Sequence, residues 1–167
     1  MTGKERFLAA LSGGRPDRVP IFLRDLTLGL DLIDAPTPAV SAGYDSRRAA
    51  EAVIASRRRF HEDAVVGCIH DLGLDAEPLG GTVDFPERGV PRVSQPPLAD
   101  DEAARCAQAF DPAHAGRWPQ VIATYRLVSE QLGDAAAVAA NIEGPVTRAG
   151  ILRGLEQFSM DMMLDPA

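Results

Sequence analysis

The sequence lacks a long apolar run, a secretory leader pattern and a cysteine framework, and each absence excludes a class of protein. No apolar segment approaches the roughly 18–20 residues that span a bilayer. The opening residues, MTGKERFLAAL, have neither the apolar core nor the small-residue cleavage site of a signal peptide. The two cysteines, Cys68 and Cys106, are too few for a disulfide scaffold and match no Cys-x-x-Cys metal spacing. We therefore expect a cytoplasmic protein with no membrane partner.

Clustered basic charge and the common nucleotide motifs are also missing. The net charge is −7, which disfavours nucleic acid as a partner. The one dense basic run, SRRRF at 56–60, is more typical of a solvated helix face than of a phosphate-binding patch. No Gly-x-Gly-x-x-Gly motif or phosphate loop follows a strand pattern, and no Gly-x-Ser-x-Gly elbow is present. These absences disfavour a nucleotide cofactor and a serine hydrolase site.

The chain does contain a series of helix patterns. Its 167 residues are 46% hydrophobic and 25% charged, which suits one domain with a core. Helices are predicted after the capping box of Thr2 and Glu5, over 46–60 with Ser46 as N-cap, over 100–110, over 117–132, and from Pro145 onward. The first of these helices is expected to bury Phe7, Leu8 and Leu11 on one face.

Short apolar runs lie between the helices and are predicted to be buried strands. They occur at 19–23, 64–69 and 135–142, whereas the proline-rich segment 82–98 indicates a small hairpin or irregular excursion. Strands that are apolar on both faces and are separated by helices indicate a parallel α/β sheet. An open doubly wound sheet and a (β/α)8 barrel both fit this order.

Polar residues follow each predicted strand at its carboxyl end. The pairs are Arg24 and Asp25, His70 and Asp71, and Asn141 and Glu143. In both parallel architectures ligands bind at the carboxyl ends of the strands, so these six side chains are candidates for a site on one rim. The alternative is that polarity simply returns where a buried strand ends.

The stretch CIHDLGLDAEPLGG, residues 68–81, concentrates several chemically active side chains. Cys68 and His70 could share one face, yet no further cluster completes a tetrahedral metal site, so we expect no metal here. His70 could instead be a histidine satisfied by a backbone carbonyl. Asp75 and Glu77 fit a loop or helix start. We expect Asp71 to pair with Arg24, as a substrate-orienting pair or as a structural ion pair.

Three blocks of the sequence, in order, resemble one known family. They are TGKERFLAALSGGRPDRVPIF, DLGLDAEPLGGTVDFPERGVPRV and NIEGPVTRAGILRGLEQFSMDMMLDP. They are similar to the uroporphyrinogen decarboxylase superfamily, which includes the methylcobamide:coenzyme M methyltransferases. The resemblance implies the N-terminal portion of a (β/α)8 barrel, with about three parallel strands, covering helices and a site at the strand ends.

The resemblance also implies roles for individual residues. Asp71 and Arg24 match the catalytic positions, and His70, Asn141 and Glu143 would bind the substrate. The decarboxylases carry a second arginine where this sequence has Leu28, and the block IEGPVTRAG is closer to the methyltransferase branch. The expected reaction is therefore methyl transfer between a methylcobamide and a thiol. The alternatives are uroporphyrinogen decarboxylation in porphyrin biosynthesis, and a non-catalytic half-barrel that needs a partner chain.

Cofactors and partners follow from the same resemblance. The methyltransferase branch implies a zinc-bound thiolate, but its His-x-Cys and later Cys ligands belong to the second half of the barrel. We therefore expect residues 1–167 to form an incomplete barrel domain that binds no cofactor alone, with a corrinoid as co-substrate. The expected partners are a small thiol or tetrapyrrole, a corrinoid protein, and either a second copy or a complementing C-terminal half.

Overall fold

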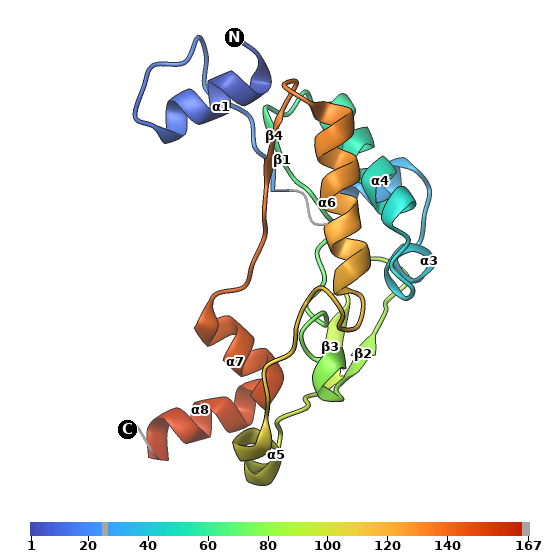
Figure 1. Cartoon of the computed structure of the whole chain (residues 1–167), viewed down its shortest axis with the longest axis vertical. Helices are drawn as coiled ribbons and strands as arrows, with labels where there is room; N and C mark the ends of the chain where they lie inside the picture. Colours follow the sequence, from blue (N-terminus) through green and yellow to red (C-terminus); the bar gives the residue numbers. More distant parts are fainter. Residues whose placement is uncertain (25–26, 165–167) are drawn as a thin grey trace.

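The computed structural model describes residues 1–24 and 27–164, and within these ranges it is an α/β fold (Figure 1). Two short parallel strands, β1 (Ala64–Val66) and β4 (Ala137–Ala139), lie side by side with Ala64 opposite Ala137. The two longest helices, α4 (Ser46–Phe60) and α6 (Trp118–Leu132), pack together on one side of these strands. The predicted helices over 46–60 and 117–132 and the predicted parallel sheet are thus confirmed.

Helix α4 buries a face of small and branched residues. Ala49, Ala50, Val53 and Ile54 are buried in the core against β1 and α6. Asp45, rather than the predicted Ser46, is the N-cap, because its carboxylate accepts hydrogen bonds from the Arg47 and Arg48 amides. The small alanines let α4 approach its neighbours closely.

The remaining elements surround this core. They are α2 (Leu28–Leu32), α3 (Thr37–Ser41), the 3₁₀ turn η1 (Glu77–Leu79), the antiparallel hairpin β2 (Thr82–Asp84) and β3 (Arg92–Gln95), α5 (Asp101–Cys106), α7 (Pro145–Arg153) and α8 (Leu155–Leu164). The hairpin predicted within 82–98 and the helix predicted from Pro145 are confirmed. No helix in the described ranges is long and apolar enough to cross a bilayer.

The first predicted strand is wrong. Residues 19–23 run as extended chain beside β1, where the Ile21 carbonyl accepts hydrogen bonds from the Asp63 and Ala64 amides. They form no regular ladder, since Pro20 has no N–H to donate. Val19 is 84% exposed, so the segment is not buried either.

Helix α1 (Gly3–Leu11) begins at the predicted capping box of Thr2 and Glu5 but does not bury the predicted face. Leu8 and Leu11 are exposed, and Arg6 is instead the buried residue of the helix. An ion pair attaches the helix to the rest of the fold, because the Arg6 guanidinium contacts a buried carboxylate beneath the helix.

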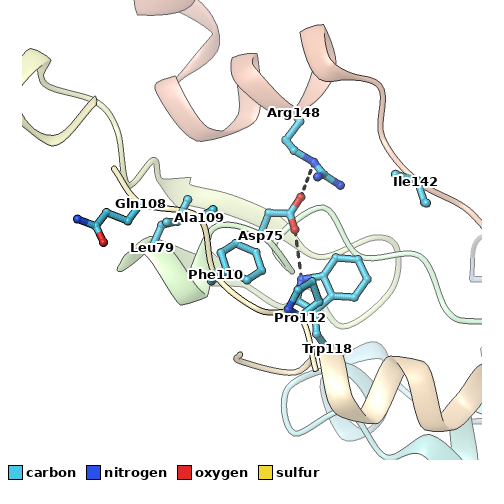
Figure 2. A pocket seen from close by; sticks show the side chains of 9 residues that line it. All are labelled: Asp75, Leu79, Gln108, Ala109, Phe110, Pro112, Trp118, Ile142 and Arg148. Atoms are coloured by element: carbon cyan, nitrogen blue, oxygen red, sulfur yellow. Dashed lines mark hydrogen bonds and ion pairs between the residues drawn. The ribbon is translucent and has the colours of Figure 1, made fainter. Parts of the chain in front are cut away.

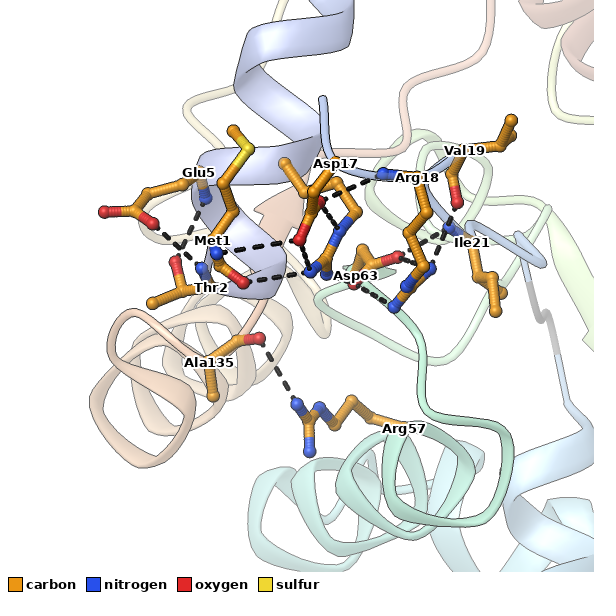
Figure 3. A network of polar contacts seen from close by, with 11 residues as sticks. Met1, Thr2, Glu5, Asp17, Arg18, Val19, Ile21, Arg57, Asp63 and Ala135 are labelled. Atoms are coloured by element: carbon orange, nitrogen blue, oxygen red, sulfur yellow. Dashed lines mark hydrogen bonds and ion pairs between the residues drawn. The ribbon is translucent and has the colours of Figure 1, made fainter. Parts of the chain in front are cut away.

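That carboxylate belongs to Asp63, which immediately precedes β1 (Figure 3). Asp63 accepts hydrogen bonds from Arg6 Nη1 at 2.5 Å, from Arg18 and from the Ile21 amide. Burial tends to raise the pKa of Asp63, but these hydrogen bonds outweigh burial and hold the pKa below its usual value. This network fastens α1 and the extended segment to the amino end of the sheet, opposite the rim where the candidate residues lie.

Candidate functional site

The carboxyl ends of β1 and β4 bring together four of the predicted side chains. His70 Nδ1 lies 2.8 Å from Asn141 Nδ2, and His70 Nε2 lies 3.5 Å from Glu143 Oε1. Arg24 Nη2 donates a hydrogen bond to Asn141 Oδ1 at 3.2 Å. The parallel register of the two strands explains this meeting, because residues that follow Val66 and Ala139 emerge at the same edge. Asp25, the remaining rim candidate after the first segment, lies outside the described residues.

His70 is held as a neutral ring. Burial lowers its pKa below the ordinary value, and the nearby Arg24 charge acts in the same direction, while Glu143 and Asp71 oppose the shift. The Asn141 amide nitrogen can only donate, so Nδ1 accepts and the proton of the neutral ring lies on Nε2. Nε2 is the ring nitrogen that lies 3.5 Å from Glu143 Oε1.

Asp71 does not pair with Arg24 as predicted. Its buried carboxylate forms an ion pair with Arg117 Nη1 and accepts a 2.7 Å hydrogen bond from the Gly73 amide. Arg24 adopts a left-handed backbone conformation, with φ of 52°, and its guanidinium contacts Asn141 instead. Asp71 and Arg24 still lie at the same rim, because Asp71 follows His70 in the chain and Arg24 binds Asn141, which contacts His70.

Arg117 is the hub of this part of the site. It donates to Ser41 O at 2.8 Å and to Glu77 Oε2 at 2.7 Å, and its guanidinium lies 4.9 Å from the centre of the Phe85 ring. Burial opposes its charge, but the hydrogen bond to Asp71 outweighs burial and the pKa of Arg117 is raised. Asp71 is therefore a fixed, charge-compensated carboxylate behind the rim.

Sequence reasoning missed Arg117, although one signal was present. The residue directly precedes α6, where a positive charge opposes the helix dipole. An arginine at the start of a helix, where the helix dipole disfavours positive charge, indicates that an acidic side chain pairs with it. Glu77, predicted as a helix-start acid, does begin η1 and also serves as that partner.

Cys68 takes part in the core. Its thiol donates to the Tyr125 hydroxyl at 3.3 Å, and burial raises its pKa to about 11. The Tyr125 hydroxyl also accepts a hydrogen bond from the backbone N–H of Asn141 at 3.0 Å, which fixes the end of β4. Among the described residues, no three metal-ligating side chains gather into one group. The described residues therefore do not provide a ligand set that fits zinc.

Asp75, predicted as a loop acid, lines a cavity beside the rim (Figure 2). Its carboxylate pairs with Arg148 Nε at 2.6 Å and accepts from Trp118 Nε1 at 3.2 Å. Burial raises the pKa of Asp75, and the charge of Arg148 partly offsets this effect. The cavity has a volume of about 470 Å³.

Comparison with known proteins connects this geometry to a family. The family model described as uroporphyrinogen decarboxylase (URO-D) matches residues 2–167. The chain belongs to the uroporphyrinogen decarboxylase family. This membership confirms the family resemblance carried by the three sequence blocks.

Two proteins to which this chain is similar come from Methanosarcina mazei. A methylated-thiol–coenzyme M methyltransferase of Methanosarcina mazei is 27% identical over 99% of this chain and 45% of its own length. A solved methyltransferase structure from Methanosarcina mazei superposes with a TM-score of 0.83 at 26% identity, covering 99% of this chain and 49% of that one. The chain thus spans about half the length of the relatives it matches. The α/β fold expected for one portion of a (β/α)8 barrel is confirmed.

Proposed function

We propose that this uroporphyrinogen decarboxylase family member supplies part of the site of a methyltransferase that moves a methyl group between a methylcobamide and a thiol. The observation that carries the proposal is the similarity, over 99% of the chain, to a protein named as a methylated-thiol–coenzyme M methyltransferase. A rim of hydrogen-bonding groups at the ends of β1 and β4 supports it.

In this proposal some rim residues bind the substrate and others accept a proton. Arg24 is exposed and offers a guanidinium to an anionic group of a substrate, while Asn141 orients both Arg24 and His70. When a methylcobamide methylates a thiol, the S–H bond and the cobalt–carbon bond break, and an S–C bond forms. The cobalt keeps the electron pair of its broken bond, and the proton of the thiol must leave. The pair of His70 and Glu143 can hold that proton.

Asp71 acts behind these groups. Its side chain is fully buried, and both of its oxygens are engaged by Gly73 and Arg117. We infer that it fixes the turn after β1, and through that turn the position of His70. We therefore propose a positioning role for Asp71 in place of the substrate contact that the family resemblance implies.

A methyl-transfer assay tests the role of the rim. Methylcobalamin and a small thiol are supplied to the protein completed by a second half-barrel of the family, and the thioether product is measured by mass spectrometry. We expect Glu143→Gln to lower the rate by about 10²-fold or more, since general acid–base groups contribute factors of that order. The control Glu156→Gln, exposed on α8, should leave the rate unchanged. Equal rates for both variants would remove Glu143 from the site.

A second candidate function is a half-barrel that must associate with a complementing half. Large apolar side chains are exposed on the segment beside β1 and on α7 and α8: Val19, Leu23, Val146, Leu155, Met163 and Leu164. The solved relative continues beyond the matched part for another half of its length. A second half-barrel of the same family, in the same polypeptide or a separate one, would cover these groups.

Co-expression with the unmatched half of the Methanosarcina mazei relative tests this association. We expect the two halves to co-elute at one-to-one stoichiometry in size-exclusion chromatography. Val19→Asp with Leu155→Asp should abolish co-elution, whereas an exposed polar change such as Glu51→Gln should not. Methyl transfer by this chain alone, as a monomer, would contradict the need for a complement.

A further inference from the structure

Tyr125 extends from α6 to the place where β1 and β4 end, and the proposed function gives this side chain no role. Helix α6 lies alongside the two strands (Figure 1). The tyrosine ring packs over Gly67, the residue that follows β1, since a Cβ added at Gly67 would lie 2.3 Å from Tyr125 Cδ1 and 2.6 Å from Val138 Cγ1. A side chain at position 67 would therefore occupy the place of the ring, and glycine there lets the ring reach the carboxyl ends of both strands.

The hydroxyl of Tyr125 joins these two strand ends. After β4, the backbone N–H of Asn141 donates a hydrogen bond to it at 3.0 Å. After β1, Cys68 Sγ lies 3.3 Å from the same oxygen. Burial raises the pKa of Tyr125, so the group remains a neutral hydroxyl. Its removal would take away the acceptor of the Asn141 N–H.

The side chain of Asn141 can adopt only one orientation among its neighbours. Its Oδ1 accepts a hydrogen bond from Arg24 Nη2 at 3.2 Å, and its Nδ2 donates one to Glu143 Oε1 at 3.3 Å. Exchanging the amide oxygen and nitrogen would set two donors against each other at Arg24 and two acceptors at Glu143. The amide nitrogen therefore faces His70 Nδ1, at 2.8 Å.

This contact with Asn141 bears on the charge of His70. A protonated imidazole carries N–H on both ring nitrogens, so a charged His70 would set Nδ1–H against the amide donor of Asn141. The charge of Arg24 also disfavours protonation, whereas Glu143 and Asp71 favour it. A firmly placed Asn141 thus helps to keep His70 neutral, the state in which an imidazole can accept a proton.

We propose that Tyr125 is a positioning residue of the candidate site, whose hydroxyl holds the backbone of Asn141 at the point where its amide binds His70 Nδ1. Tyr125 acts through Asn141 and not on a substrate. Its importance for methyl transfer rests on the proposed function, whereas its effect on His70 can be measured without any substrate.

NMR of the histidine rings tests this role. The chain has three histidines, so the full chain is labelled with ¹⁵N-histidine and titrated with acid, and His70→Gln identifies the His70 signals. We expect a wild-type midpoint below the ordinary value of about 6.5, with Nδ1 unprotonated above it. Tyr125→Phe, which removes only the hydroxyl, should raise the midpoint by about 0.5 pH unit or more, as expected from losing one hydrogen bond that favours the neutral ring.

Thr124→Val is the matched control. Thr124 is buried on the same helix, and its hydroxyl donates to the Gln120 carbonyl at 2.9 Å. This variant also loses a buried hydroxyl but should keep the wild-type midpoint of His70. The same midpoint in Tyr125→Phe as in the wild type, or an equal shift in Thr124→Val, overturns the proposal.

Hydrogen exchange in the wild type decides if Tyr125→Phe fails to fold. The backbone N–H of Asn141 should exchange about tenfold more slowly, or more slowly still, than in an unstructured peptide, because the Tyr125 hydroxyl binds it. Exchange at the unstructured rate overturns the proposal. A shifted His70 midpoint in a completed protein that transfers no methyl group would support the role of Tyr125 and refute only the proposed function.

Discussion

At the scale of single residues, Arg117 organises the candidate site more than any residue that the sequence singled out. It joins Asp71 after β1, Glu77 at the start of η1 and the Ser41 carbonyl at the end of α3. Three segments distant in sequence are thereby fixed by one side chain. The position of the strand end after β1, and so of His70, depends on this cation.

Replacing Arg117 should therefore destabilise the fold. We expect Arg117→Met to lower the free energy of unfolding by about 3–5 kcal/mol, because it leaves the Asp71 carboxylate buried without its counter-charge. Urea denaturation followed by circular dichroism measures this change. Arg58→Met, at an exposed position of α4, should change it by less than about 0.5 kcal/mol. Equal effects of the two substitutions would show that the Asp71–Arg117 pair does not hold the site together.

The buried, neutral His70 gives a pH dependence with a definite sign. Its pKa is lowered in the folded state, so the unfolded chain takes up this proton first as the pH falls below the ordinary value of about 6.5. Stability is fully present above that pH and is lost as the pH falls towards the folded-state pKa. We expect wild type to lose stability more steeply than His70→Gln in this window, with a difference in slope of at most about 1.4 kcal/mol per pH unit.

Denaturation midpoints at a series of pH values between about 7.5 and 5 provide the measurement. His114→Gln is the matched control, since His114 is exposed and pairs only with the exposed Asp111. That variant should follow the wild type except for the small loss of a surface pair. A wild-type slope that matches His70→Gln would mean that His70 is not held neutral by burial.

At the scale of elements, the sequence predicted the helices better than the strands. The apolar spacing over 46–60 and 117–132 fixed both long helices, because a helix of four turns shows its buried face in its own residues. The run 19–23 has the composition of a buried strand, yet its burial depends on what packs against it. Val19 remains exposed among the described residues, which composition alone does not reveal.

In the candidate site, too, some contacts could be predicted from the sequence and others could not. Parallel register brings together the residues that follow β1 and β4, so their meeting was predictable from the strand order. The partner of Asp71 was not, because Arg117 arrives from the start of α6 and the pairing depends on how that helix lies across the sheet. Arg24 binds Asn141 and has a left-handed backbone conformation, which no sequence pattern predicted.

Close packing of α2 against α4 gives a prediction at this scale. A Cβ added at Gly29 would lie 2.3 Å from the Ala52 carbonyl oxygen, which is backbone and cannot rotate away. We expect Gly29→Ala to destabilise the protein by about 1–3 kcal/mol through overpacking, measured as a shift in the urea midpoint. Gly43→Ala is the control, since a Cβ there meets nothing within 4 Å. A stability of Gly29→Ala equal to that of the control would show that α2 is loosely packed.

At the scale of the whole molecule, the two ends of the sheet have different tasks. The Asp63 network at the amino end binds α1 and the extended segment to β1, whereas the carboxyl end gathers hydrogen-bonding side chains at the rim. This division of stability and chemistry between opposite ends is the rule in (β/α)8 barrels.

The position of Leu28 bears on the branch of the family to which this chain is most similar. Leu28 is exposed where the resemblance places a second arginine of the decarboxylases, so the rim carries less positive charge for a substrate with many carboxylates. The relative named as a methyltransferase agrees with that difference. Both observations favour methyl transfer over decarboxylation.

The most direct test of methyl transfer offers both reactions to the same protein. The chain, completed by a second half-barrel of the family, is given methylcobalamin with a small thiol in one reaction and uroporphyrinogen in another. Thioether and coproporphyrinogen are then quantified by mass spectrometry. We expect thioether to form with turnover and no coproporphyrinogen to appear. Release of coproporphyrinogen without thioether formation would contradict the proposed function.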